Sequence, residues 1–156
     1  MCVIVDNDVC HEIIGPRSTP VGIHLRKWIT NKGSKLVVGG QVLRELAENS
    51  DFRRWLAEAL ASGIAMRFSD QSVDELALEL KADCESNDSH IIALARVSGA
   101  RLLFTRDNSL KRDFKNRKLL GGSVRGRVYT SNKLRPGLRD SHKRLLQNTN
   151  LCESQI

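Results

Sequence analysis

Short apolar runs alternate along the chain with longer stretches in which apolar residues recur every three or four positions. The short runs are flanked by turn residues, a pattern typical of strands that are buried on both faces. We expect strands at residues 2–5, 35–38, 64–68, 102–105 and, with a weaker pattern, 124–129. The longer periodic stretches predict helices at residues 21–30, 41–48, 51–62, 70–83 and 87–98.

Residues that favour helix ends agree with these boundaries. Ser50 or Asp51 is expected to cap the third helix, Ser86 or Asn87 is expected to cap the last one, and Gly99 is expected to end it. Because strands alternate with helices, we predict an α/β fold, a three-layer α/β/α sandwich with a central, mainly parallel sheet. We expect this domain to cover residues 1–130, followed by a basic tail over residues 131–156 for which no order is predicted.

The composition is that of a soluble globular protein, with 40% hydrophobic and 28% charged residues among 156. The chain shows no apolar run of the roughly 20 residues that a membrane span needs, and no secretory signal. We therefore expect a cytoplasmic protein without a membrane partner. None of the four cysteines forms a C-x-x-C pair, so the spacing argues against a zinc site.

The net charge of +7 is unevenly distributed. Residues 1–100 hold 11 Lys and Arg against 14 Asp and Glu, whereas residues 101–156 hold 14 against 4. A basic segment beside an acidic one suits a polyanionic substrate, and we expect residues 111–144 to contact nucleic acid phosphates. A solvated basic tail is the simpler alternative. Aromatic residues make up only 4% of the chain, which leaves little surface on which bases stack.

Four acidic residues lie close to predicted strand ends or helix starts: Asp6, Glu45, Asp88 and Asp107. Each has an ordinary explanation on its own, as a turn residue, a helix cap or a solvent-facing side chain. Their joint placement is more informative, because the carboxyl ends of parallel strands meet at one edge of a sheet. Carboxylates about 5 Å apart repel by roughly 3 kcal/mol per pair at an effective dielectric of about 20. Such a group calls for a cation, and oxygen ligands favour Mg²⁺ or Mn²⁺.

The segments around these acids resemble the PIN-domain nucleases over most of residues 2–130. The matching stretches are residues 3–9 (VIVDNDV), 36–46 (LVVGGQVLREL), 87–95 (NDSHIIALA) and 99–107 (GARLLFTRD). The spacing of the last two acids, a helix and a strand apart, is the most specific feature. The first stretch alone is a weak signal.

The resemblance implies that Asp6, Glu45, Asp88 and Asp107 are both the metal ligands and the catalytic residues of a metal-dependent endoribonuclease, holding one or two Mg²⁺ or Mn²⁺ ions. In such a site a metal-bound water attacks the phosphodiester. Thr105 and Asn108 are expected to support the acids. Many small PIN proteins are VapC-type toxins, so the resemblance also implies an antitoxin partner and a homodimer, beside RNA as substrate.

Several neighbouring residues have open roles at this point. Asp8 is an additional carboxylate where the family usually has Asn, Ser or Thr, and it is either a further ligand or turned away. His90 is two residues from Asp88 and is expected on a different face of the helix, as an exposed or hydrogen-bonded side chain. Asp113 is expected on a helix surface rather than in the site.

Rival functions remain open from the sequence. The D-x-D-x-V segment at Asp6 also resembles the start of haloacid-dehalogenase-type phosphatases, in which Asp6 is the nucleophile and Asp8 the general acid. The Ser or Thr and the Lys that this class needs are absent from the expected positions. A receiver domain would need a phosphoacceptor Asp at the end of a strand near the middle of the chain, and this sequence has none at such a position. A non-catalytic PIN-like module that binds RNA is the remaining alternative, and the full set of acids argues against it.

Overall fold

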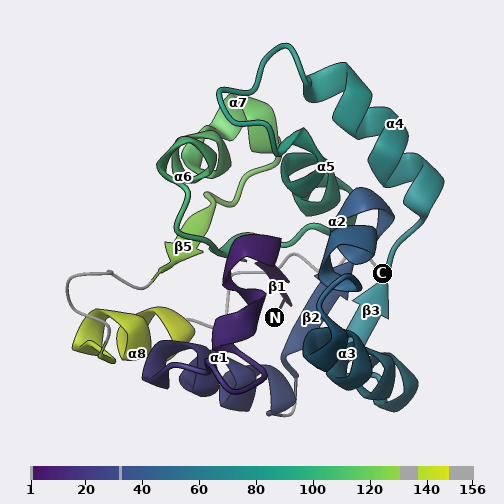
Figure 1. The fold of residues 1–156 in the computed structure, drawn as a ribbon. Helices are drawn as coiled ribbons and strands as arrows, with labels where there is room; N and C mark the ends of the chain where they lie inside the picture. Colours follow the sequence, from purple (N-terminus) through teal and green to yellow (C-terminus); the bar gives the residue numbers. More distant parts are fainter. Residues whose placement is uncertain (1, 32, 131–136, 148–156) are drawn as a thin grey trace.

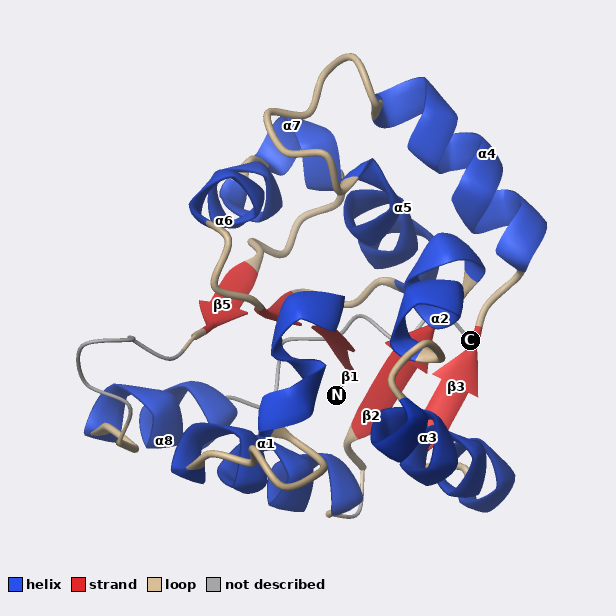
Figure 2. Ribbon diagram, in the orientation of Figure 1, coloured by secondary structure: helices blue, strands red, loops and turns tan. Residues whose placement is uncertain are grey.

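A single parallel sheet organises the molecule. The computed structural model describes residues 2–31, 33–130 and 137–147, and within them the chain forms a five-stranded sheet (Figure 2). The strands are β1 (Cys2–Val5), β2 (Lys35–Val38), β3 (Ala65–Arg67), β4 (Leu102–Phe104) and β5 (Arg127–Tyr129), in the order β3-β2-β1-β4-β5. Every neighbouring pair is parallel. The predicted fold class is therefore confirmed.

Helices cover both faces of this sheet. They are η1 (Asn7–Glu12, a 3-10 helix), α1 (Pro20–Thr30), α2 (Gly40–Leu46), α3 (Ser50–Ser62), α4 (Asp70–Leu80), α5 (Ser89–Ser98), α6 (Asn108–Lys115), α7 (Arg117–Leu120) and α8 (Asp140–Gln147). In Figure 1, helices α4 to α7 lie on one side of the sheet, and α1, α3 and α8 lie on the other. The three layers follow from the alternation of strands and helices, because each crossover must return to the same edge of a parallel sheet.

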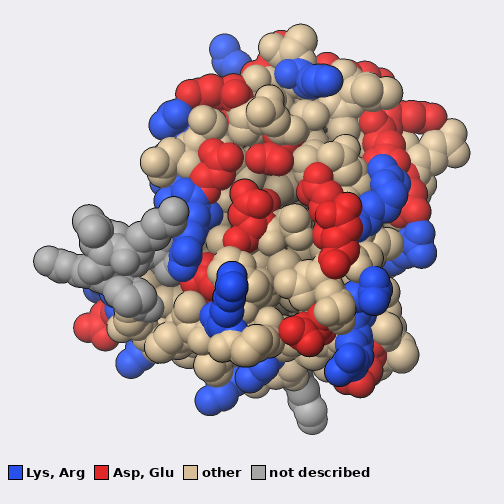
Figure 3. All heavy atoms as spheres, in the orientation of Figure 1, with Lys and Arg blue, Asp and Glu red and all other residues tan. Residues whose placement is uncertain are grey.

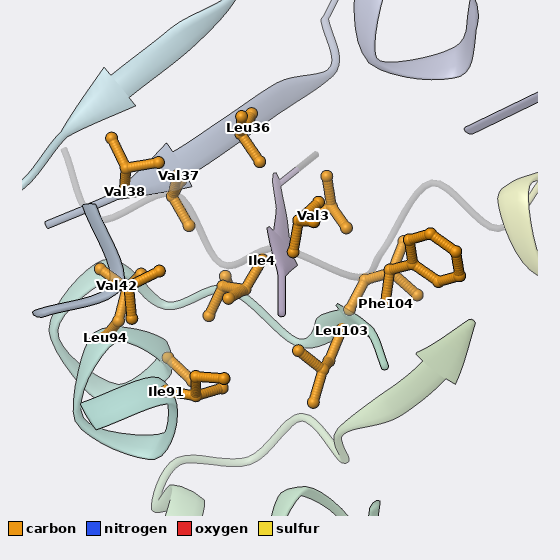
Figure 4. Packing of buried hydrophobic residues seen from close by; sticks show 14 of the residues in the cluster. Val3, Ile4, Leu36, Val37, Val38, Val42, Ile91, Leu94, Leu103 and Phe104 are labelled. Carbon is orange, nitrogen blue, oxygen red and sulfur yellow. The ribbon is translucent and has the colours of Figure 1, made fainter. Parts of the chain in front are cut away.

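The core occupies both faces of the sheet, and one part of it lies where the sheet meets α5. Successive side chains of a strand point to opposite faces. Figure 4 accordingly shows Ile4 of β1 pointing toward Ile91 and Leu94 of α5, while Val3 points away from them. All of these side chains are buried. Burial on both faces explains why the central strands are uninterrupted apolar runs rather than alternating ones.

Most helix starts differ from the predicted ones by one or two residues, whereas α4 starts at the predicted residue 70. Asn49 caps α3 by accepting a hydrogen bond from the backbone N–H of Phe52 (3.0 Å), and Ser69 caps α4. Asp88, rather than Ser86 or Asn87, occupies the cap position of α5. Several adjacent residues are competent caps in each segment, and the backbone conformation decides among them.

Part of the predicted basic tail is a helix that packs on the domain. In α8, Leu146 is 5% exposed, and its carbonyl oxygen accepts a hydrogen bond from Nε1 of Trp28 in α1 (2.7 Å). The imidazole of His142 lies against the ring of Tyr129 at the end of β5. The prediction of a tail over residues 131–156 did not include this helix, and residues 131–136 and 148–156 lie outside the described part. Within the described part, no helix is long and apolar enough to cross a membrane.

Candidate functional site

Asp6 stands at the carboxyl end of β1, the central strand of the sheet. Its side chain is buried, with the residue 4% exposed. Oδ2 accepts a hydrogen bond from the hydroxyl of Thr105 (2.8 Å), the residue that follows β4. The same hydroxyl oxygen accepts from the backbone N–H of Asp107 (3.1 Å). Thr105 thus connects two of the predicted acids, as expected for a supporting residue.

Asp107 combines a structural contact with its place at the sheet edge. It is the N-cap of α6, and its Oδ1 accepts a hydrogen bond from the backbone N–H of Leu110 (3.1 Å). The N-terminus of a helix favours a carboxylate at this position. Asn108, the other expected supporting residue, is exposed at the start of α6.

Asp88 sits at the N-cap position of α5, but its carboxylate makes no capping hydrogen bond. The loop that precedes Asp88 is held by hydrogen bonds to Asp113 of α6, a residue that is distant in the sequence. One oxygen of Asp113 accepts from the backbone N–H of Glu85 (2.9 Å), and the other accepts from that of Ser86 (2.8 Å). Asp113 is 4% exposed, so the expectation of a surface residue is wrong. A buried carboxylate needs such donors, and here they fix the approach to Asp88.

Glu45, on α2, is oriented by two neighbouring side chains. Gln41 donates to Oε1 through Nε2 (2.9 Å), and His90 donates to Oε2 through Nε2 (3.0 Å). Nε2 of His90 also lies 3.9 Å from Oδ1 of Asp88. His90 is 3% exposed, so it is hydrogen-bonded as expected, but it lies beside the acids rather than on a face away from them.

The N-terminus of α2 is fixed by acids of α4. The backbone N–H groups of Gly40 and Gln41 donate to Asp70 (2.9 Å) and Asp74 (3.0 Å), and these bonds satisfy donors that a helix start leaves open. Gly40 has a φ of 54°, and a Cβ there would lie 2.6 Å from Oδ1 of Asp74. The close packing therefore needs glycine. It sets the position from which Glu45 faces the sheet edge.

The carboxylates act on one another electrostatically. The pKa of Asp6 is raised to about 6, chiefly because the group is buried; the hydrogen bond from Thr105 opposes this, and the charges of Asp8 and Asp88 add to it. The pKa of Asp88 is raised as well. Burial is again the largest cause, followed by the opposing influence of His90 and then by the charges of Asp107, Glu45 and Asp8. We call Asp6, Asp8, Glu45, Asp88 and Asp107 the acidic cluster.

A cleft of about 450 Å³ opens beside this cluster, lined by Asp8, Val9, His11, Arg106 and Asp107. Asp8 is exposed in η1, so it faces solvent rather than the core. Nη2 of Arg106 lies 2.5 Å from Oε1 of the buried Glu12, an ion pair that orients the guanidinium at the cleft. Figure 3 shows Asp and Glu side chains gathered in the middle of the face over η1, α2, α5 and α6, with Lys and Arg around them.

The donor chemistry of the cluster fits a hard divalent cation, because its ligand atoms are carboxylate oxygens. Across residues 2–31, 33–130 and 137–147, no group of three or more His, Cys, Asp or Glu side chains converges closely enough to hold a metal ion. The oxygens of Glu45 and Asp107 are engaged by protein donors instead. Binding a cation would require the side chains to turn toward a common point.

Sequence reasoning missed Arg106, Asp113 and His90 as contributors to this region. A usable signal existed for His90, because a residue in the first turn of a helix that starts at the carboxyl edge lies near that edge. No local signal marks Arg106 or Asp113, whose partners lie far away in the sequence. Comparisons with protein-family models, with curated proteins and with solved structures find no match to this chain.

Proposed function

We propose that this protein is a divalent-metal-dependent nuclease that hydrolyses phosphodiester bonds of RNA. One observation carries the proposal: Asp6, Glu45, Asp88 and Asp107 come from four separate segments and gather at the carboxyl edge of a parallel sheet. There burial first, and then the charges of neighbouring carboxylates, raise the pKa values of Asp6 and Asp88. A fold gains no stability from such mutual repulsion, so a cationic ligand is its natural counterpart.

The chain's own residues have distinct parts in this proposal. Asp6, Asp88 and Asp107 supply oxygen ligands, with Glu45 as a fourth. His90 and Gln41 orient Glu45, and Thr105 orients Asp6. A bound Mg²⁺ or Mn²⁺ ion would supply an activated water and neutralise charge on the reacting phosphate.

Arg106 has a separate part beside the cluster. It lines the cleft next to Asp107, where a guanidinium binds a phosphate group of the substrate. We further propose RNA rather than DNA as the substrate, an antitoxin partner and a homodimer, each of which the resemblance to PIN-domain nucleases implies.

The test measures cleavage and metal binding together. Purified protein is incubated with labelled single-stranded RNA and Mn²⁺, and Mn²⁺ binding is followed by calorimetry. Asp88→Asn should lose most of the cleavage and weaken Mn²⁺ binding, because Asp88 has no capping bond that would explain its placement otherwise. Asp83→Asn makes the same chemical change at an exposed position and should retain both activities.

The result also separates the rival functions. Undiminished cleavage by Asp88→Asn in excess chelator would refute the proposal. Hydrolysis of a phosphomonoester with no cleavage of RNA would favour the phosphatase. RNA binding by the wild-type protein, with neither Mn²⁺ binding nor cleavage, would favour the non-catalytic module.

A further inference from the structure

A groove of about 440 Å³ runs between α1 and α8, on the side of the sheet opposite α5. Trp28 and Leu146 form its inner wall, joined by the hydrogen bond from Nε1 of Trp28 to the Leu146 carbonyl. Because α1 runs back from the carboxyl edge toward the amino edge of the sheet, the groove leads away from the acidic cluster. Its lining shares no residue with the cleft beside that cluster.

The charged side chains that line this groove are cationic. Lys27 of α1 and Lys143 of α8 are both exposed and come from different helices, and His24 of α1 lines the groove with them. The pKa of His24 is lowered, first by partial burial and then by the charges of Lys143, His142 and Lys27. Both lysines therefore act on the same point from different helices. None of the described residues that line the groove is acidic.

The shape and composition of the groove favour a polymer backbone over a base. Among the described residues that line the groove, Trp28 is the one Phe, Trp or Tyr. The residue is only 8% exposed and its ring N–H is already hydrogen-bonded, so it offers no face on which a base could stack. Lysine ammonium groups bind phosphates as point charges and carry no sequence information. Figure 3 shows Lys and Arg side chains along the edge of the molecule where Figure 1 places α1 and α8.

We propose that the groove between α1 and α8 is a binding site for the phosphate backbone of single-stranded nucleic acid, with Lys27 and Lys143 as its contacts. The site goes beyond the proposed nuclease activity, because it lies apart from the acidic cluster and needs no metal ion. It gives the molecule a grip on the polymer that does not depend on sequence. A strand held here is retained at the protein whether or not it is cleaved.

The experiment measures binding of a short fluorescent oligouridine in the presence of chelator, over a series of salt concentrations. Each phosphate contact to a single strand contributes about −0.7 to the slope of log K against log salt. The double variant Lys27→Gln/Lys143→Gln should therefore reduce the magnitude of the slope by about 1.4, which corresponds to about a 25-fold loss of affinity at 0.1 M salt relative to 1 M.

Two matched variants make the outcome specific. Lys27→Arg/Lys143→Arg keeps both charges and should bind like the wild type. Arg53→Gln/Arg54→Gln removes the same charge from exposed positions on α3 and should leave the slope unchanged. Thermal melts of all variants confirm that the fold is intact, which is expected because every substitution is on the surface.

The proposal is overturned if the Lys27→Gln/Lys143→Gln protein binds with unchanged affinity and slope, or if the α3 variant loses as much, since net charge would then explain the effect. Displacement of the oligouridine by inorganic pyrophosphate at constant ionic strength would also overturn it, in favour of a small phosphate ligand. Because chelator is present throughout, loss of cleavage activity in another assay has no bearing on this result.

Discussion

The hydroxyl of Thr105 donates a 2.8 Å hydrogen bond to Oδ2 of Asp6, so the end of β4 supports the carboxylate at the end of β1. Both residues are buried, and their strands are neighbours in the sheet. The contact satisfies one oxygen of a carboxylate that would otherwise lie in a poor environment for charge. It is the clearest single bond between the scaffold and the acidic cluster.

Replacing this hydroxyl with a methyl group should destabilise the protein. Thr105→Val keeps the shape of the side chain, but it removes the donor to Asp6 and the acceptor of the Asp107 N–H. We expect a loss of roughly 1–3 kcal/mol in the free energy of unfolding, measured with urea. Thr30→Val, at an exposed hydroxyl, should change stability little. A loss of equal size in both variants would show that the hydrogen bonds of Thr105 make no specific contribution to the free energy of unfolding.

The raised pKa of Asp6 should give metal-free protein a characteristic pH dependence. The group binds its proton more tightly in the folded state, with a pKa of about 6 against an ordinary value of 3.8. Its contribution to stability is therefore fully present below about pH 4 and is lost as the pH rises through about 6, by at most about 3 kcal/mol. Asp88, whose pKa is also raised, changes stability in the same direction.

Urea unfolding of wild-type protein and Asp6→Asn in chelator, at about pH 5 and about pH 7, measures this contribution. The wild type should lose more stability between the two pH values than Asp6→Asn, because the amide does not titrate. Equal pH dependence in the two proteins would show that Asp6 is not the group responsible.

Asp107 should have separable structural and functional contributions. Asparagine is as good a helix cap as aspartate, so Asp107→Asn should leave the stability of metal-free protein nearly unchanged. Asp107→Ala removes the acceptor of the Leu110 N–H and should cost about 1 kcal/mol. Both variants should lose stabilisation by added Mn²⁺, measured in thermal melts.

The cap of α3 provides the control for this comparison, because Asn49→Ala removes an equivalent capping bond at a residue outside the acidic cluster. This variant should lose similar stability and keep the full response to Mn²⁺. Retention of that response by Asp107→Asn would remove Asp107 from the metal ligands.

Docking of α8 should contribute measurably to stability. Leu146 is 5% exposed and Leu78 is 75% exposed, so the same truncation of side chain has different consequences at the two positions. Leu146→Ala should cost roughly 2–4 kcal/mol, and Leu78→Ala should be close to neutral, in urea unfolding followed by tryptophan fluorescence. No difference between them would show that α8 does not pack on α1 in solution.

Much of the architecture is predictable because its signals are local. The run at 35–38 coincides with β2, and Gly99 ends α5 in the left-handed conformation expected of a C-terminal glycine. An apolar run and a helical period reflect which faces are buried, and burial is a property of each segment's own sequence. The parallel sheet follows from the alternation of such segments. That alternation also predicts that Asp6 and Asp107 lie at the same edge, because each of them follows a strand of one parallel sheet.

What the sequence determined by itself is thus the order of the five strands and of the helices α1 to α5, the parallel sheet and the edge at which the acids gather. The tertiary structure alone decided which partner each side chain meets: His90 beside Glu45, Asp113 under the loop before Asp88, and α8 against Trp28. These contacts join residues that are far apart in the chain, and nothing in the local pattern of either partner encodes the other. They depend on how the layers pack, and that packing is specified by the whole set of buried side chains rather than by any one segment.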